Sequence, residues 1–405
     1  MNSASPARLS TPEGVRALAA ATAMTGADPL AAASALRAQG IPPDLAAAAL
    51  TQVDLRRRAE IKFGPAAARM FFTRAGLEQA TRAVVADRRA ARLAATGVRT
   101  MADLGCGLGS DALAAARAGI SVYAVDADPV TAEYAAANAE ISGLSEWIRV
   151  ECADATTVPV EKYDAVFADP ARRRSGGGRV FDPKAYSPPW DFVAGLADRV
   201  PRTVLKLAPG IAHELLPPGA EGEWVSVGGD LVEAAFWCGP LAEVPRRATL
   251  LPATGPGAGG PGGGGRGVAG GCQLTGSGRE KAPVGQVGRF LYDPDPAVVR
   301  AHLVAEFAAT VGGRLADPDI AYVYTDAPLD TPYGRRLEIT DVLPFSLKRL
   351  RALLRERRVG RLEIRKRGSA LEPDQLRKQL KLAGPEAASL VLTKVAGAPT
   401  AILCR

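Results

Sequence analysis

The chain has 405 residues, of which 47% are hydrophobic and 23% are charged; this globular composition excludes disorder of the whole chain. The length exceeds what one ordinary hydrophobic core holds, so we expect two or three domains. The net charge of +7 favours a polyanionic partner, but arginine richness can also come from genome composition, so local clusters of charge carry more information.

The first 95 residues predict an N-terminal helical domain, residues 1–95. Alanine, leucine and arginine recur at helical spacing over residues 12–95, with breaks at 26–29 and 40–43. The first eight residues lack the apolar stretch of a signal peptide, and no apolar run reaches the roughly 18 residues that span a bilayer. The sequence therefore predicts a cytoplasmic protein that does not enter the membrane.

A polar cluster within this region has two interpretations. Glu78, Gln79 and Thr81 follow a turn at Gly76 and exceed what a simple amphipathic helix needs. The cluster fits an ordinary capped helix, or a segment that closes over a ligand held by the next domain. In the second case Glu78 and Gln79 are candidate substrate-binding residues.

The most informative stretch is residues 101–110. A strand-like run reaches Asp103, and Gly105, Gly107 and Gly109 follow at alternate positions before an apolar, helix-like run. Glycines there allow positive φ and close approach of the backbone to a ligand. Dinucleotide sites use the spacing G-x-G-x-x-G, and a carboxylate would repel a phosphate but attract an amine or a sulfonium. The stretch therefore predicts a turn that holds an amino-acid-bearing nucleoside.

Three more strand-like runs end in aspartates. They lead to Asp126 with Ala127, to Asp154 with Ala155, and to Asp169 with Pro170. Because parallel strands present their carboxyl ends at one edge of an open sheet, the four aspartates of these strand ends are expected in a row at the ligand-binding edge. Asp126 is placed to accept hydrogen bonds from both hydroxyls of a ribose. A helix cap or a plain turn explains each aspartate alone, but their joint order favours a ligand site.

The strand-like runs 203–208, 223–227 and 231–237 complete a predicted seven-stranded sheet in residues 96–252. Only residues 228–230 separate the last two runs, so these must pair antiparallel. Glycine and proline dominate much of residues 253–285, which predicts a flexible linker. Residues 286–405 alternate helix-like and strand-like runs and predict a small α/β domain that binds the substrate.

Basic residues cluster in this C-terminal domain, with few acidic residues between them in sequence. They are Lys348, Arg349, Arg351, Arg355, Arg357, Arg358, Arg361, Arg365, Lys366 and Arg367. A solvated helix face is one explanation. A surface that follows phosphates is the other, and it is favoured because the strand end Arg365–Arg367 continues the helix patch.

Cysteine and histidine are sparse. The five cysteines, Cys106, Cys152, Cys238, Cys272 and Cys404, form no C-x-x-C pair, and there are two histidines. We therefore expect neither a disulfide framework nor a metal site, and no Ser-His-Asp or Cys-His catalysis.

Together, these motifs resemble those of bacterial class I S-adenosylmethionine-dependent methyltransferases with a THUMP-like C-terminal domain. The glycine turn, the order of strand-end aspartates, the terminal hairpin and the basic segment 361–368 carry the resemblance, which spans roughly residues 55–405. It implies a Rossmann-like α/β sheet, S-adenosylmethionine as cofactor and, by analogy alone, RNA as partner. A more distant resemblance, limited to the sheet and the preceding helices, is to trimethylguanosine synthase, which methylates guanine N2 on RNA caps.

The resemblance also implies roles for individual residues. Asp154 corresponds to an acidic side chain on the adenine amino group. Asp169 and Pro170 stand where related enzymes carry D/N-P-P-Y/F/W, a motif that accepts hydrogen bonds from an exocyclic amine. Arg172 replaces the aromatic residue and, with Arg173, suits an anionic acceptor. Lys206, at the end of the following strand, is expected at the same rim.

The leading hypothesis is an RNA methyltransferase that acts on an exocyclic base nitrogen. Similar uridine C5 enzymes carry Asp-Pro-Pro-Arg at this strand end, but they need a cysteine nucleophile. A methyltransferase of a small molecule or a protein, and a non-catalytic RNA-binding protein, are the other hypotheses.

Overall fold

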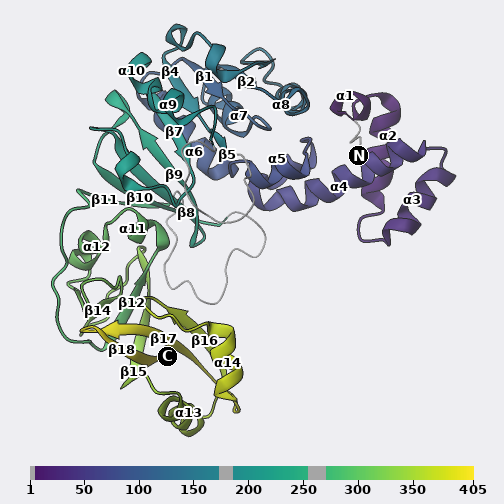
Figure 1. Cartoon of the computed structure of the whole chain (residues 1–405). Coiled ribbons are helices and arrows are strands. Elements are labelled where there is room, and N and C mark those ends of the chain that lie inside the picture. The colour runs from purple at the N-terminus through teal and green to yellow at the C-terminus, as the bar shows by residue number, and fades with distance from the viewer. Residues whose placement is uncertain (1–4, 173–185, 254–270) are drawn as a thin grey trace. The chain divides into compact units, whose positions relative to one another are not determined.

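The computed structural model describes residues 5–172, 186–253 and 271–405 (Figure 1). These residues form two compact units. The first contains the residues up to Glu221 and Glu233–Glu243, and the second contains Gly222–Val232, Val244–Pro252 and the C-terminal residues from 271 onward. None of the described helices is both long and apolar enough to cross a membrane.

The first unit begins with the predicted bundle of helices. These are α1 (Pro6–Leu9), α2 (Pro12–Ala23), α3 (Pro29–Ala38), α4 (Pro43–Phe63), α5 (Arg74–Gln79) and α6 (Ala83–Ala95). Proline stands at the start of each of the first four, where its missing N–H costs nothing. The side chains of Thr11, Asp28 and Thr73 cap α2, α3 and α5 by accepting backbone N–H groups.

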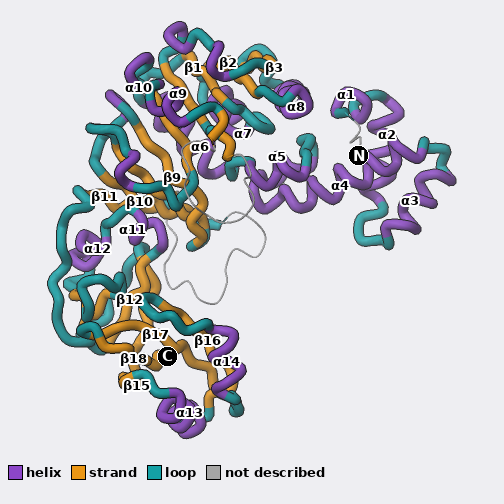
Figure 2. Tube along the Cα trace, in the orientation of Figure 1, coloured by secondary structure: helices purple, strands orange, loops and turns teal. Residues whose placement is uncertain are grey.

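A sheet with alternating helices follows, as the sequence predicts. Its first elements are β1 (Thr100–Leu104), α7 (Ser110–Arg117), β2 (Ser121–Asp126), α8 (Pro129–Ile141), β3 (Ile148–Cys152), β4 (Ala165–Ala168), β5 (Ala171–Arg172), β6 (Tyr186–Ser187), α9 (Trp190–Ala194), α10 (Leu196–Arg199) and β7 (Thr203–Leu207). Next come β8 (Glu221–Val227), β9 (Asp230–Trp237), β10 (Arg246–Leu251) and β11 (Cys272–Gly276). Figure 2 shows the strands of this sheet flanked by helices.

The sheet has nine strands in the order β11-β10-β8-β9-β7-β4-β1-β2-β3. Strands β3, β2, β1, β4 and β7 are parallel to one another, and β9 runs antiparallel to β7. The neighbours β8 and β9 are joined by Gly228 and Gly229, both at positive φ, as the predicted hairpin requires.

The prediction of seven strands missed two strands at the end of the sheet. β10 pairs parallel with β8, and β11 pairs antiparallel with β10. β11 lies inside residues 253–285, which the sequence assigned to a flexible linker, so that assignment extended too far. Five residues beside a glycine-rich run carry little strand signal, and pairing with β10 decides their conformation; residues 254–270 lie outside the described residues.

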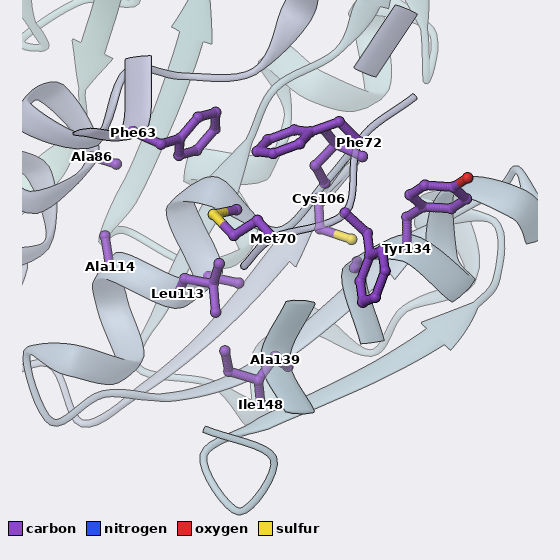
Figure 3. Close-up of a cluster of buried hydrophobic side chains, with 14 of the residues drawn as sticks. Phe63, Met70, Phe72, Ala86, Cys106, Leu113, Ala114, Tyr134, Ala139 and Ile148 are labelled. Carbon is purple, nitrogen blue, oxygen red and sulfur yellow. The ribbon is translucent and has the colours of Figure 1, made fainter. Parts of the chain in front are cut away.

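The hydrophobic core of the first unit joins the helical bundle to the sheet. Phe63 from α4 and Met70 and Phe72 from the following segment pack with Leu113 of α7 and Tyr134 of α8 (Figure 3). The N-terminal helices are therefore part of the same core as the sheet, because they cover its apolar residues.

The second unit contains a seven-stranded sheet. Its elements are β12 (Phe290–Pro294), α11 (Pro296–Arg300), α12 (Val304–Thr310), β13 (Arg314–Leu315), β14 (Val323–Thr325), β15 (Gly334–Pro344), α13 (Leu347–Glu356), β16 (Val359–Lys366), α14 (Pro373–Leu380), β17 (Glu386–Val395) and β18 (Ala398–Cys404). The strand order is β13-β14-β12-β15-β18-β17-β16. Leu350 and Leu354 of α13 and Leu376 and Leu380 of α14 share a core with leucines of β16, β17 and β18. This confirms the predicted small α/β domain.

Candidate active site

The predicted glycine turn connects β1 to α7. Gly105, Gly107 and Gly109 all adopt left-handed φ angles, of 88°, 56° and 83°. A Cβ added at Gly105 would lie 3.1 Å from the carbonyl oxygen of Asp169, so only glycine lets the turn pass the end of β4 this closely. Gly109 immediately precedes α7. The turn therefore brings bare backbone and a helix N-terminus to the carboxyl edge of the sheet.

Asp103 places an unpartnered carboxylate below this turn. Its side chain is fully buried, and neither oxygen accepts a hydrogen bond from the described residues. Burial raises the pKa of Asp103 well above its usual range, and the carboxylates of Asp111 and Asp169 raise it further. The cations Arg89 and Lys206 act in the opposite direction. A buried carboxylate without a donor is costly, so this position suits a ligand that brings a positive charge.

Asp126 is fixed by the same turn. Its Oδ2 accepts the N–H of Gly107 at 3.1 Å, and its Oδ1 accepts the N–H of Asp128 at 3.0 Å. Burial raises the pKa of Asp126, while these two backbone hydrogen bonds lower it. Each carboxylate oxygen keeps a further lone pair, so both can accept from a vicinal diol. Ala127, the next residue, offers its carbonyl to the Cys152 thiol at 3.8 Å.

Asp154 caps a short turn of helix. Its Oδ1 accepts the backbone N–H and the hydroxyl of Thr156, both at 2.8 Å, and these hydrogen bonds lower its pKa. The capped turn is Ala155–Thr157, in which Ala155 is buried. Asp154 therefore acts as a helix cap, which was the alternative explanation for each aspartate, and it does so through one of its two oxygens.

The strand register confirms the predicted row of aspartates along the sheet edge. β3, β2, β1 and β4 are consecutive parallel neighbours, and Asp103 pairs in register with Ala124 on one side and Phe167 on the other. Asp126 ends β2, Asp169 follows β4 directly, and Asp154 lies two residues after the end of β3. The four residues therefore lie at the carboxyl ends of adjacent strands, where open α/β sheets bind ligands.

Asp169 forms an ion pair with Lys206. The Lys206 ammonium donates to Asp169 Oδ2, and the two side chains are 12% and 33% exposed, respectively. Burial lowers the pKa of Lys206, but the carboxylates of Asp169, Asp111 and Glu233 outweigh burial and raise it above its usual range. Lys206 was predicted to contact the substrate. The structure directs its ammonium to Asp169, because β4 and β7 are adjacent parallel strands whose register, continued one residue past Ala168 and Leu205, sets Asp169 beside Lys206; its contact with the substrate stays a prediction.

A second buried ionic cluster supports this pair and was not found by sequence analysis. Arg89 of α6 donates to Asp111 of α7 and to Glu233 of β9, and its guanidinium lies 4.7 Å from the Phe167 ring centroid. All three charged side chains are buried. A charged residue inside an otherwise apolar stretch of helix or strand, such as Glu233, is the sequence feature that could have indicated this cluster.

The segment before α5 is held by two buried amides, one of which also reaches the glycine turn. Asn138 accepts the N–H of Phe71 and donates to the carbonyls of Phe71 and Leu108. Gln52 likewise donates to the carbonyl of Phe72 and accepts its N–H. Each amide thus satisfies both backbone groups of one residue, as a neighbouring strand would.

Helix α5 then packs on the turn itself. A Cβ at Gly76 would lie 2.8 Å from the Leu108 side chain. Glu78 and Gln79 are exposed at the end of α5, and their roles as substrate ligands stay predictions. Of the predicted acceptor-binding arginines, Arg172 is described as part of β5 only in its backbone, and Arg173 lies outside the described residues.

In the second unit, the basic strand end is neutralised within the fold. Arg365 donates to Asp293 and Glu363, Arg367 donates to Asp293 at 2.8 Å, and Lys366 donates to Glu372 at 2.7 Å. These three side chains are therefore paired with carboxylates within the domain, and their role as phosphate ligands stays a prediction. Asp293 is distant in sequence and lies on β12, which is not a neighbour of β16 in the sheet, so only the folded domain brings it to this strand end.

Three family models match the sequence. A methyltransferase domain model matches residues 101–171, a THUMP domain-like model matches residues 334–405, and a model described as a domain of unknown function matches residues 3–59. The first covers the glycine turn and all four strand-end aspartates.

Relatives and solved structures agree with these matches. A Mycobacterium tuberculosis protein, described as an uncharacterized S-adenosylmethionine-dependent methyltransferase, is 34% identical over 367 residues, which cover 87% of this chain and 94% of the relative. The protein of a second strain matches equally. The crystal structure of a candidate methyltransferase from Porphyromonas gingivalis W83 has a TM-score of 0.68 at 21% identity and covers 99% of this chain and 94% of its own, which shows a shared fold.

Proposed function

The chain belongs to the S-adenosylmethionine-dependent methyltransferases, and on this premise we propose that it transfers a methyl group to an exocyclic nitrogen of a base in RNA. The family confirms the cofactor that the motifs predicted. The acceptor and the methylated atom are the proposal. Asp169 carries it, because this carboxylate follows β4 directly beside the glycine turn and is one-third exposed.

The residues of the site fit the cofactor. The unpartnered, buried carboxylate of Asp103 would hold the methionyl ammonium, and Asp126 would hold the ribose hydroxyls. The turn of Asp154 and Ala155 would border the adenine. Bound there, the cofactor supplies an electrophilic methyl group for an in-line displacement, so the protein's main task is to align the acceptor.

Asp169 and Pro170 would align that acceptor. The Asp169 carboxylate and the Pro170 carbonyl are hydrogen-bond acceptors, so they would orient an exocyclic amine and ease the loss of its proton. Lys206 holds one oxygen of Asp169, which leaves Oδ1 for the amine. The same pair restrains the carboxylate, since Lys206 is itself mostly buried.

RNA as the acceptor is supported by the second unit. The THUMP domain-like match covers α13, whose side chains Lys348, Arg349 and Arg355 are exposed and make no side-chain hydrogen bond or ion pair within the described part of the chain. Unlike the strand end of Arg365, this helix face keeps its positive charge available for phosphates. A cytoplasmic location belongs to the same proposal.

Reversing the charge of these three side chains is expected to weaken RNA binding. In Lys348→Glu/Arg349→Glu/Arg355→Glu, the slope of log affinity against log salt for an RNA stem–loop should fall by about 3, because each cation that contacts a phosphate releases a counterion. Fluorescence anisotropy across a salt series measures this slope. The matched control reverses Arg16, Arg37 and Arg57 on the N-terminal helices and should keep the slope. Equal slopes for both triple variants would refute this surface.

Identification of the methylated nucleoside tests the rest of the proposal. Mass spectrometry of RNA nucleosides from a deletion strain and its parent should show one N-methylated base missing in the deletion strain, and the purified protein should restore it in vitro. Loss of a C5-methylated uridine instead would support the alternative chemistry, and an unchanged RNA profile would favour a small-molecule or protein acceptor.

The cysteines give the uridine alternative little support. Burial raises the pKa of Cys106, and it raises that of Cys238 to about 11, which disfavours the thiolate that such catalysis needs. Cys152 is exposed, but it ends β3, and both β1 and β2 lie between β3 and β4, which leads to Asp169. The non-catalytic alternative is tested separately by calorimetry, because a protein with a degenerate site would not bind S-adenosylmethionine.

A further inference from the structure

Lys62 makes an unusual set of contacts at the end of α4. Its ammonium donates to the carbonyls of Leu77, Glu78 and Ala80, at 2.7, 2.8 and 2.9 Å. An ammonium has three N–H donors, so all are engaged by one short segment. These carbonyls lie at the C-terminal end of α5, where a helix leaves its acceptors unsatisfied and where a cation is favoured.

The segment that Lys62 holds borders the cofactor site. α5 packs through Gly76 on Leu108, which stands between two glycines of the cofactor turn. Burial lowers the pKa of Lys62 to about 8, and the nearby positive charges of Arg82 and Lys206 contribute to this lowering. Lys206 in turn pairs with Asp169. Residues 77–81 therefore follow directly on the part of α5 that packs on the glycine turn, and the lysine that holds them lies within electrostatic range of Lys206.

Thr81, the residue after the last of these carbonyls, has a free polar group. Its side chain is 5% exposed, and its hydroxyl has no hydrogen-bond partner among the described residues. A buried hydroxyl without a partner is uncommon and suits a bound ligand. Because Lys62 fixes the Ala80 carbonyl, it also fixes the direction in which the chain enters Thr81.

We infer that Lys62 is a positioning residue for the cofactor: it holds residues 77–81 so that the Thr81 hydroxyl contacts bound S-adenosylmethionine. Lys62 itself acts through this segment and through no direct contact. The charged and titratable groups around it are Arg82, Lys206 and Glu78. A purely structural cap would stabilise α5 without affecting the cofactor.

The test measures binding and local order separately, with S-adenosylhomocysteine as the probe. In Lys62→Met, calorimetry should show about tenfold weaker binding, and hydrogen exchange should accelerate at residues 74–82 while the strands of the sheet stay protected. Thr81→Val should weaken binding to a similar extent without that acceleration. The control Lys162→Met removes an exposed lysine of the same unit and should change neither readout.

The double variant Lys62→Met/Thr81→Val distinguishes positioning from capping. If Lys62 acts through Thr81, the double variant binds about as weakly as either single variant, because both remove the same contact. Fully additive losses, or unchanged binding in Lys62→Met despite accelerated exchange, would overturn the inference. Lys62→Gln keeps two N–H donors and should give an intermediate affinity, which preserves the test if the methionine variant folds poorly. Failure of the unaltered protein to bind the probe would instead count against the assigned cofactor.

Discussion

Replacing Asp169 with alanine is expected to slow methyl transfer by two decades or more, or about 3 kcal/mol, while the affinity for S-adenosylmethionine changes within severalfold. The carboxylate follows β4 and is held by Lys206, so its loss removes an acceptor for the amine and leaves a mostly buried ammonium without its partner. Single-turnover kinetics with the RNA acceptor give the rate of transfer, and calorimetry gives the affinity for the cofactor.

Two controls make this result specific. Asp87→Ala removes an exposed aspartate paired with Arg117 in the same unit and should leave both quantities unchanged. Asp169→Asn keeps one side-chain oxygen as an acceptor, as the related D/N-P-P-Y/F/W motif allows, and should lose less rate than the alanine variant. If Asp169→Ala transfers methyl at the normal rate, the role proposed for this residue is wrong.

Asp103→Asn is expected to change stability and cofactor binding in opposite directions. In the free protein the buried, unpartnered carboxylate costs stability, so the amide variant should be more stable at neutral pH by about 1–3 kcal/mol. The variant lacks the negative charge that would pair with the ammonium of S-adenosylmethionine, so it should bind the cofactor about a hundredfold more weakly. This loss is at the lower end of the range for removing one partner of a buried charge pair. Chemical denaturation and calorimetry measure the two effects.

The raised pKa of Asp103 adds a pH dependence with a defined sign. The folded chain binds this proton more tightly than the unfolded chain, so the contribution of Asp103 to stability falls as pH rises from the usual value of 3.8 to the raised pKa. Binding of a cationic ligand favours the ionised carboxylate. Cofactor binding should therefore release a proton over this pH range and tighten as pH rises.

Calorimetry in buffers of different ionisation enthalpy counts the released proton. Asp103→Asn should abolish the release that comes from this carboxyl group, whereas Asp87→Asn should keep it. Undiminished proton release in Asp103→Asn would show that another group takes up the cofactor's charge.

The local sequence sufficed to place the cofactor turn and the carboxylates beside it. Alternating glycines after Asp103 force a tight turn whatever surrounds it, and strand-like runs separated by helices can only form parallel strands whose ends share one edge. The helical bundle and the small C-terminal domain were predicted from the spacing of apolar residues, which is also a local property of the sequence. Strand β11 escaped because five residues beside a glycine-rich run acquire their conformation from β10.

Which charges meet was decided by the tertiary structure. Arg89 and Glu233 are 144 positions apart, and Arg365 and Asp293 are 72 apart. No local spacing predicts such pairs, because an ion pair depends on the distance in space that strand order sets. The sequence by itself determined the fold class, the cofactor and the row of aspartates. Only the packed chain showed that Lys206 serves Asp169, that Arg365–Arg367 are already neutralised, and that Lys62 holds the segment over the glycine turn.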